Sequence, residues 1–310
     1  MILTVTPNPC VDKTVFIDTL EVGAFMRAQR YTCIPGGKGA NVARAVKTLG
    51  HASTAMVVVG GHTGAHVVDM IEKDDGVPCL PVWVKSPTRT ITTVLEEKLH
   101  RQTAFFEPGS HVTDVEYTEI VETFQRHVAD VDVVTFNGTV SDPAIARLYR
   151  DLIPLAKAAG AITVLDSHGP EFVHGLDAVP HMVKPNIAEA SELVAFELGD
   201  EAAQWRAIEC FHDRGVKLVV LSRGKHGALV SDGDTKLSVT PPEINEVNPV
   251  GSGDCLLAAF AIGLAEKQPL EVMARRAVAA GTANAMCWDI GHFALETFEN
   301  ICGQVRVRSL

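Results

Sequence analysis

Several features are missing from this chain of 310 residues, and each absence excludes a class of protein. The seven cysteines are odd in number and form no C-x-x-C pair, so we expect reduced thiols in the cytoplasm rather than a disulfide framework. No apolar run reaches the ~20 residues that span a bilayer. The opening segment, Met1–Thr6, has the pattern of a short strand and lacks the basic region of a signal peptide. We therefore expect a soluble, cytoplasmic protein with no membrane partner.

The chain is also poor in basic residues. Lysine and arginine number 27 against 38 aspartate and glutamate residues, which gives a formal net charge of −11. Nucleic-acid binders usually carry a basic surface, so we expect no nucleic-acid partner. An acidic chain that binds an anionic substrate must gather its lysines and arginines into one pocket. Basic residues inside sequence motifs are therefore the first candidates for ligand contacts.

Two nucleotide-binding fingerprints are absent. The first predicted strand runs into Thr6–Asp12 rather than G-x-G-x-x-G, which argues against a nicotinamide-dependent dehydrogenase. The glycine-rich segment Pro35–Asn41 is not a P-loop, because Lys38 is followed by Gly39 instead of serine or threonine. Internal repeats and low-complexity segments are missing as well.

Short apolar runs alternate with longer segments of helical periodicity, in a chain of which 46% is hydrophobic. The predicted strands are Ile2–Thr6, Thr54–Val59, Val131–Phe136, Ile162–Asp166, Met182–Lys184 and Leu218–Ser222. The predicted helices are Asn41–Leu49, His66–Lys73, Asp142–Ala159, Ile187–Phe196 and Ala203–Arg214. This alternation favours an α/β fold with a doubly wound, mainly parallel sheet, whose ligands bind at the carboxyl ends of the strands.

Two segments, Cys10–Ile34 and Leu80–Phe106, break this alternation. Both contain β-rich stretches such as Thr14–Ile17 and Pro81–Val84, so we expect them to form one small antiparallel β lid over the strand ends. The predicted α/β nucleotide-binding and catalytic domain comprises residues 1–9, 35–79 and 107–310, and the predicted lid comprises residues 10–34 and 80–106. A small open sheet leaves apolar surface uncovered. We therefore predict a homodimer formed through the lid.

The most informative stretch is Gly251-Ser252-Gly253-Asp254, which precedes the apolar run Cys255–Leu264. The run predicts a buried helix, and the N–H groups of its first turn have no intrahelical partner. Together with the helix dipole they favour an anion, which the small residues allow to come close. An acid beside a bound phosphate is suited to take a proton from an attacking hydroxyl, as in a kinase. Taken alone, Asp254 is equally well explained as a helix cap.

A second glycine-rich helix start lies at Pro35–Asn41. It leads into an amphipathic helix that ends at Gly50, and it places Lys38 and Asn41 near the beginning of that helix. A lysine and an amide in this position suit a ligand that is both polyhydroxylated and anionic.

These motifs, in this order, resemble the ribokinase-like carbohydrate kinases of the PfkB type, and within them the branch of 1-phosphofructokinase and tagatose-6-phosphate kinase. The resemblance covers almost the whole chain. Its motifs are Thr6-Pro7-Asn8-Pro9 with Asp12, Pro35–Asn41, Thr88-Arg89, Glu107-Pro108-Gly109, Val183–Asn186 with Glu189, Leu221–Gly224 with Gly227-Ala228, and Val250–Asp254. The resemblance implies a ribokinase-like fold and phosphoryl transfer from ATP, with Mg²⁺, to a hydroxyl of a phosphorylated ketohexose.

The resemblance also implies which residues serve catalysis and substrate binding. The implied general base is Asp254, and the implied anion hole is formed by Gly251, Ser252 and Gly253. The implied contacts to sugar hydroxyls are Asp12, Gly37 and Asn41. The candidates for the phosphate already present on the substrate are Arg89 and Lys38, with Arg27 as a third.

For the nucleotide and the metal, the resemblance implies a second set of residues. Glu189, with Asn186, is implied to hold Mg²⁺ through water, which suits an ion that keeps several of its waters. The implied nucleotide contacts are Asn186, Ser222, Arg223, Gly224, Gly227 and Asn284.

One motif departs from the family. Members of the phosphosugar branch usually carry Ser-Gly-Ser-Leu-Pro after the third main strand, and here residues 137–141 read Asn-Gly-Thr-Val-Ser. Because the change concerns the contact to the substrate's phosphate, a kinase for an unphosphorylated sugar or nucleoside stays open as the alternative. A regulator that binds nucleotide or sugar without turnover is a third reading, which the intact Asp254, Asn186 and Glu189 disfavour.

Overall fold

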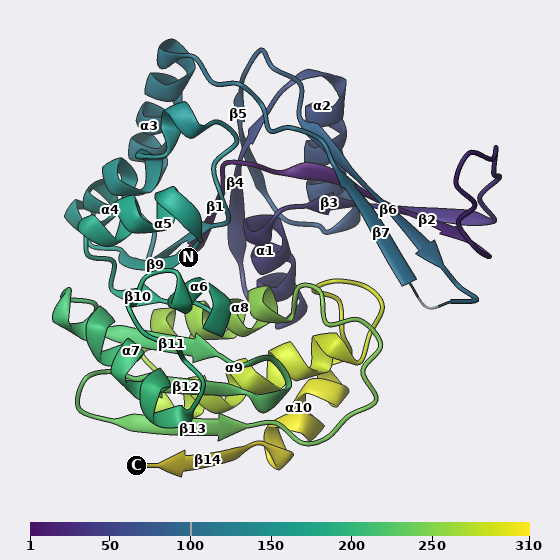
Figure 1. Cartoon of the computed structure of the whole chain (residues 1–310). Helices are drawn as coiled ribbons and strands as arrows, with labels where there is room; N and C mark the ends of the chain where they lie inside the picture. The colour runs from purple at the N-terminus through teal and green to yellow at the C-terminus, as the bar shows by residue number, and fades with distance from the viewer. Residues whose placement is uncertain (100) are drawn as a thin grey trace.

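A ten-stranded sheet forms the centre of the molecule (Figure 1). The structure, a computed structural model, describes residues 1–99 and 101–310. In sheet order the strands are β14 (Arg306–Ser309), β13 (Lys236–Thr240), β12 (Ala228–Ser231), β11 (Leu218–Ser222), β10 (Met182–Val183), β9 (Ile162–Asp166), β8 (Val133–Asn137), β1 (Ile2–Thr6), β4 (Ser53–Val59) and β5 (Cys79–Trp83). The strands from β11 to β5 are parallel to one another, and β12, β13 and β14 are antiparallel. The predicted doubly wound, mainly parallel sheet is confirmed.

Helices cover both faces of this sheet, which explains why its central strands are apolar along their whole length. One face carries α3 (Asp114–His127), α4 (Leu148–Ala158), α5 (Gly169–Asp177) and α7 (Glu201–Asp213). The other face carries α1 (Lys38–Thr48), α8 (Ser252–Ala265), α9 (Leu270–Ala285) and α10 (Leu295–Gln304). Beside α1 lies α2 (Gly61–Asp69), which continues into a π-helical turn, and a short α6 (Ile187–Ser191) follows β10.

A second, smaller sheet projects from the side of the large one (Figure 1). Its strands, in order, are β3 (Arg30–Gly36), β2 (Cys10–Ile17), β6 (Arg89–Glu96) and β7 (Arg101–Phe106). The outer pairs are antiparallel, as predicted, whereas the central pair of β2 and β6 is parallel. The reason is topological. Both β2 and β6 run away from the large sheet, and the chain comes back along β3 after β2 and along β7 after β6. We refer to this four-stranded sheet as the lid.

The prediction that Pro81–Val84 belongs to the lid is wrong. These residues lie in or next to β5, which pairs in parallel with β4 at the edge of the large sheet. The chain from β4 through α2 to β5 is a βαβ unit, and its crossover returns the strand to the same sheet. Val82 and Val84 are buried in the large core, and Pro81 is tolerated because an edge strand can lose one N–H donor. The division into two domains otherwise stays a prediction.

Candidate active site

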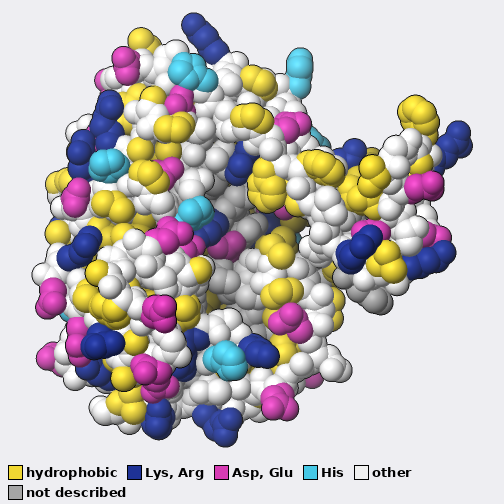
Figure 2. Space-filling model, viewed as in Figure 1, with side chains coloured by type: hydrophobic (Ala, Val, Ile, Leu, Met, Phe, Trp, Pro, Cys, Tyr) yellow, Lys and Arg dark blue, Asp and Glu magenta, His cyan; other side chains and the backbone are white. Residues whose placement is uncertain are grey.

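An open cleft of about 1680 Å³ lies at the carboxyl ends of the parallel strands. Its walls include the loops that follow β10 and β11, the first turns of α1 and α8, and parts of β13 and β14. Figure 2 shows a hollow near the middle of the molecule, with acidic and basic side chains gathered at its edge. The cleft therefore lies where the sequence predicted a ligand site.

The first turn of α8 has the geometry of an anion site. Gly251 precedes the helix in the left-handed conformation, with φ of 79°, and a Cβ atom there would lie 2.3 Å from Cγ2 of Ile290. Only glycine fits at this position. The N–H of Ser252 donates to the Pro249 carbonyl at 3.2 Å, and the N–H of Asp254 donates to the Gly251 carbonyl at 3.0 Å. The N–H of Gly253 therefore stands out as the first-turn donor available to a ligand.

Asp254 is buried in this turn, 6% exposed, yet lines the cleft. Burial first, and then the negative charge of Asp166, raise the pKa of its carboxyl, whereas Lys38, a hydrogen bond from Asn41 and Lys184 lower it; the net result is a pKa of about 6. That bond, from Nδ2 of Asn41 to Oδ2 of Asp254, is 2.7 Å long. A carboxyl with its pKa near neutrality can exchange protons at physiological pH, as a general base must.

The first turn of α1 faces the first turn of α8. Gly37 caps α1 with φ of 119°, and a Cβ atom there would lie 2.7 Å from Cγ2 of Thr6. This conformation allows α1 to begin directly at Lys38 and turns Asn41 toward Asp254. The two glycine-rich motifs are about 210 residues apart in the sequence and meet here through a single hydrogen bond.

Two lysines and two carboxylates form an ion cluster between the helix starts. Lys38 Nζ lies 3.2 Å from Oδ1 of Asp166 and 3.3 Å from Oε1 of Glu189. Lys184 Nζ lies 3.2 Å from Oδ2 of Asp166, whose side chain is fully buried. Burial raises the pKa of Asp166, but Lys184 and Lys38 lower it by more, so this carboxyl is ionised. Burial lowers the pKa of Lys38, and here Asp166 and Glu189 outweigh it, so Lys38 is charged.

Lys184 was not singled out from the sequence. Lys184 is only 4% exposed, and its Nζ lies 3.4 Å from the point where a Cβ atom of Gly253 would stand. It lines the cleft beside the first turn of α8. The signal in the sequence is a lysine that ends a buried strand, within Val183–Asn186, but strand ends alone do not show which loop they face.

Asp12 and Arg89, which are predicted to contact the substrate, lie at the base of the lid. Asp12 is on β2, and its Cβ lies 2.9 Å from where a Cβ of Gly36 would stand. Burial raises the pKa of Asp12, while the nearby Arg44 lowers it. Arg89 begins β6 and donates from Nη2 to the carbonyl of Asn8 at 3.3 Å, while its Nε is buried with no hydrogen-bond partner in the protein. An unpartnered guanidinium N–H suits an anion.

The divergent loop 137–141 is anchored from beneath. Tyr149 donates to the carbonyls of Asn137 and Gly138 at 2.9 and 2.7 Å, and Ser167 also donates to the Gly138 carbonyl. Asn8 joins the loop to Arg89, since its Nδ2 donates to the Val140 carbonyl at 3.3 Å. The loop thus has a fixed path next to Arg89.

Arg27 is not brought to this site. It is exposed in the loop between β2 and β3, at the end of the lid that points away from the large sheet (Figure 1). The register explains this position, because Cys10 pairs with Arg89 at the near end of the lid and Phe16 pairs with Arg30 at the far end. Within one copy of the chain, Arg27 therefore lies at the opposite end of the lid from Arg89, the other arginine predicted to bind the substrate's phosphate.

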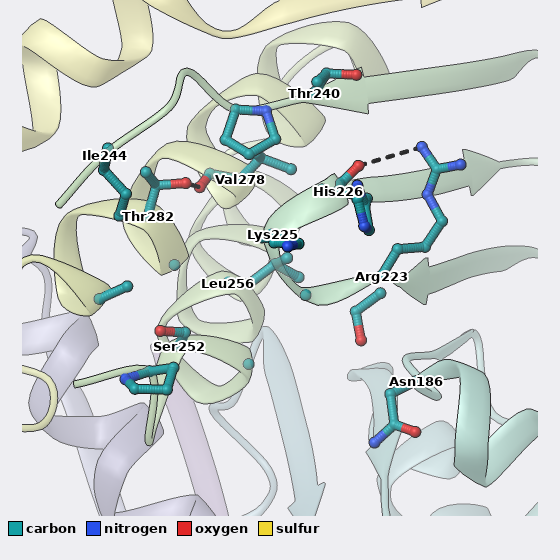
Figure 3. A pocket seen from close by; sticks show the side chains of 18 of the residues that line it. Asn186, Arg223, Lys225, His226, Thr240, Ile244, Ser252, Leu256, Val278 and Thr282 are labelled. Atoms are coloured by element: carbon teal, nitrogen blue, oxygen red, sulfur yellow. Dashed lines mark hydrogen bonds between the residues drawn. The ribbon is translucent and has the colours of Figure 1, made fainter. Parts of the chain in front are cut away.

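Most of the residues predicted to contact the nucleotide line another part of the cleft. Asn186 caps α6 and forms a capping box with Glu189, with both bonds at 2.9 Å. Ser222, Gly224 and Gly227 follow β11 and line the cleft. Apolar side chains of Ile244, Leu256 and Val278 stand opposite them (Figure 3).

The guanidinium of Arg223, which also lines the cleft, is held by protein groups. Its Nη1 lies 3.1 Å from Oε2 of Glu201, and its Nη2 donates to the carbonyl of His226 and to Oγ of Ser238, each at 3.3 Å. Figure 3 shows the guanidinium directed at His226 and away from Ser252. Its observed contacts hold the turn at residues 224–226, so the predicted contact to the nucleotide receives no support from this geometry.

Asn284 lies beneath the α8 turn instead of against a base. It is 1% exposed, and its Nδ2 donates to the Val250 carbonyl at 2.9 Å and to Oγ of Ser252 at 3.1 Å. Its Oδ1 accepts from the N–H of Gly291 at 2.8 Å. These bonds fix the turn that carries Gly251, which is a positioning role.

The described residues contain neither a ready-made metal cluster nor a membrane-spanning helix. Across residues 1–99 and 101–310, no cluster of three or more histidine, cysteine, aspartate or glutamate side chains is arranged to enclose a metal ion. In the same part of the chain, no helix combines the length and the apolar character needed to cross a membrane.

Comparison with known proteins identifies the class to which this fold and site belong. Residues 5–287 match the pfkB family carbohydrate kinases, and the chain belongs to this family. It is 30% identical over 312 residues to a tagatose-6-phosphate kinase of Staphylococcus epidermidis, with 99% of each chain covered. Phosphofructokinase-2 of Escherichia coli, solved in complex with potassium, has a TM-score of 0.90 at 29% identity over 98% of each chain. Arabidopsis thaliana ribokinase, complexed with ribose and ATP, has a TM-score of 0.78 at 20% identity over 97% of this chain and 98% of that one, which shows the ribokinase-like fold.

Proposed function

We propose that this carbohydrate kinase transfers the γ-phosphoryl group of ATP to a hydroxyl of a phosphorylated ketohexose, with Asp254 as the general base. The observation that carries the proposal is the position of Asp254, a buried carboxylate at an anion-binding helix start with its pKa raised to about 6. The related tagatose-6-phosphate kinase and phosphofructokinase-2 support the substrate class.

In the proposed reaction, Asp254 takes the proton of the acceptor hydroxyl, and the freed oxygen attacks the γ-phosphorus. The bond from that phosphorus to the β–γ bridging oxygen breaks, and ADP leaves. The N–H of Gly253 and the ammonium group of Lys184 lie where they can neutralise charge on the transferring phosphoryl group. We assign Lys38 to the transferring phosphoryl group as well, instead of to the phosphate already on the substrate, because its ammonium group shares Asp166 with that of Lys184.

The residues present fit a Mg²⁺ ion that is held largely by the nucleotide. Glu189 lines the cleft with a side chain 13% exposed; its Oε2 accepts from Asn186 in the capping box, and its Oε1 lies 3.3 Å from Lys38 Nζ. Mg²⁺ usually takes one or two carboxylates and keeps several waters. When bound, the ion would neutralise the β- and γ-phosphates, and Glu189 would hold it directly or through water.

The proposed function is tested by coupled ADP release with ATP and Mg²⁺ against matched pairs of acceptors. The pairs are fructose with its 1- and 6-phosphates, and tagatose with its 6-phosphate. We expect turnover of at least one phosphosugar and much slower turnover of the corresponding free sugar. Faster turnover of a free sugar would replace the proposal by the alternative, a kinase for unphosphorylated sugars.

The raised pKa of Asp254 predicts an acidic limb in the rate. The base works only when ionised, so kcat/KM should be constant above about pH 7 and fall about tenfold per pH unit below pH 6. The measurement is kcat/KM for the sugar from pH 5 to pH 8, with coupling enzymes in excess. A rate that stays constant down to about pH 5 would contradict this assignment of the base.

We further propose that two copies of the chain dimerise through the lid. Large apolar side chains are exposed on the lid and its β2–β3 loop, where Figure 2 shows hydrophobic side chains. They include Val22, Phe25, Tyr31, Phe105 and Phe106. Exposed apolar clusters of this kind commonly mark interfaces.

Light scattering tests the proposed dimer. We expect a mass of two chains at micromolar concentration, and at least a tenfold higher dissociation constant for Phe25→Asp. Val115→Asp, at another strongly exposed apolar position, on α3, is the matched control and should leave the dimer intact. A wild-type mass of one chain would refute the proposal.

We also propose that the protein is cytoplasmic. All seven cysteines have free thiols, which suits the reducing cytoplasm.

A further inference from the structure

Arg44, on α1, is a buried charge for which the proposed reaction gives no direct use. It is 1% exposed and is the largest of the fully buried side chains. Its Nε lies 2.8 Å from Oδ1 of Asp75, its Nη1 donates to Oδ1 of Asn41 and to the Ile290 carbonyl at 3.1 Å, and its Nη2 donates to the Pro35 carbonyl at 2.7 Å. A buried ion pair is often no more stabilising than apolar residues of the same size. The reason for a guanidinium here must therefore be sought in the groups that it joins.

Those groups include residues of the first glycine-rich motif and of a loop that packs against the second. Pro35 is the residue that opens the motif before α1. Ile290 lies against Gly251, because a Cβ there would stand 2.3 Å from Cγ2 of Ile290. Gly291 packs on the aliphatic stem of Arg44, with Cδ 3.3 Å from its would-be Cβ. One planar side chain thus connects the start of α1 with the loop that lies against the start of α8.

Arg44 also determines how Asn41 is oriented. Because a guanidinium only donates, the atom of Asn41 that faces it must be the carbonyl oxygen Oδ1. The amide nitrogen then faces Asp254 and donates to its Oδ2 at 2.7 Å. If the amide of Asn41 were flipped, its NH₂ group would face the guanidinium of Arg44, and its carbonyl oxygen would face the carboxylate of Asp254. Neither pair could form a hydrogen bond. With Oδ2 occupied, Oδ1 of Asp254 is the oxygen left for an acceptor hydroxyl.

We propose that Arg44 is a positioning residue that acts through Asn41 and thereby holds one oxygen of Asp254 toward the acceptor hydroxyl. This inference rests on the proposed role of Asp254 as the base. It also changes the interpretation of Asn41, whose carbonyl oxygen and one of whose N–H groups are used inside the protein. Only the second N–H of Asn41 is left for a sugar hydroxyl.

Arg44→Lys tests the inference, since it keeps the positive charge but loses the fork that reaches several acceptors at once. We expect kcat to fall ~10–100-fold with a KM for the sugar within about threefold of wild type. The acidic limb of the rate should move to higher pH, because a misplaced Asn41 no longer stabilises the carboxylate. The other charged groups facing Asp254 are Asp166, Lys38 and Lys184, and all three stay in place.

Thr48→Val is the matched control. Thr48 is also on α1, and its Oγ1 donates to the Gly291 carbonyl at 2.7 Å, so it ties the same loop without reaching Asn41. If Arg44 acts only by tying the loop, Thr48→Val should change kcat and the pH profile in the same way. We expect instead that Thr48→Val lowers the melting temperature and leaves both unchanged.

A double-mutant cycle makes the test decisive. If Arg44 acts through Asn41, then Arg44→Lys should cost no further activity once Asn41→Ala is present. Losses that multiply, or an Arg44→Lys enzyme with the wild-type pH profile, would overturn the inference. Arg44→Gln replaces Arg44→Lys if the lysine variant does not fold. Activity retained in Asp254→Asn would instead refute the proposed base, so the two failures are distinguishable.

Discussion

Asp254→Asn is expected to lower kcat by ~10²–10⁴-fold and to leave the KM values for ATP and sugar nearly unchanged. Asparagine has the same shape and can still accept the hydrogen bond of Asn41 through its carbonyl oxygen. It has no basicity, so the acceptor hydroxyl would keep its proton during attack. Steady-state kinetics by coupled ADP release, with the variant purified away from any host kinase, measures the effect.

The competing explanation for Asp254 is a helix cap, and it predicts a different result. A cap contributes ~1 kcal/mol of stability and nothing to the chemical step, so the rate would be retained and only the melting temperature would fall. The residual activity of Asp254→Asn should also have no acidic limb near pH 6, because the group responsible for it is gone. Full activity in this variant would remove Asp254 from the mechanism.

Arg89→Ala is expected to raise the KM for the phosphorylated sugar ~10–100-fold, with kcat at saturation within about threefold of wild type. Arg89 begins β6 next to Asn8, and its Nε has no hydrogen-bond partner in the protein. A guanidinium can bind a phosphate through two parallel hydrogen bonds, and alanine offers none. The measurement is the KM for each phosphosugar and for the corresponding free sugar.

Arg101→Ala provides the control for Arg89. Arg101 is an arginine of the same sheet, but it forms an ion pair with Glu96 at the far end of the lid. Its loss should affect lid stability without changing the KM for the sugar. Equal KM values in wild type and Arg89→Ala would mean that Arg89 does not bind phosphate, and would favour an unphosphorylated acceptor.

The two helix starts could be predicted from the sequence because each is a local signal. Glycine before an apolar helical run marks a helix start, and α8 begins at Ser252 as the motif indicates. Glycine permits the positive φ observed at Gly37 and Gly251, but residue type alone does not show which glycine of each motif adopts it. Strands covered on both faces, such as β1 and β11, could be predicted because burial on both faces makes them short runs rich in apolar residues.

The partners of the motif residues could not be predicted, because they come from distant parts of the chain. Asp166 ends β9 and Lys184 follows β10, and they meet only because these strands are neighbours in the sheet. Arg44 is one residue of an amphipathic helix and looks like a surface arginine until Asp75 is placed beside it. An acidic chain does gather basic groups at its site, but the sequence motifs pointed to Lys38 and Arg89 and not to Lys184 and Arg44.

The wrong prediction for Pro81–Val84 has a physical cause of the same kind. The segment alternates like a lid strand, yet the crossover through α2 returns it to the large sheet. The roles of Arg27 and Arg223 stay predictions. Arg27 lies in a hairpin loop at the far end of the lid, and Arg223 pairs with Glu201, and neither position could be predicted from the local sequence.

Phosphorus-31 NMR of the reaction products tests the central claim most directly. Wild-type protein with ATP, Mg²⁺ and tagatose 6-phosphate or a fructose phosphate should yield a ketohexose bisphosphate and ADP in equal amounts. The same mixture with Asp254→Asn should yield neither above background over the same time. ADP accompanied by inorganic phosphate alone, or a sugar monophosphate formed from free sugar in preference to any bisphosphate, would contradict the account.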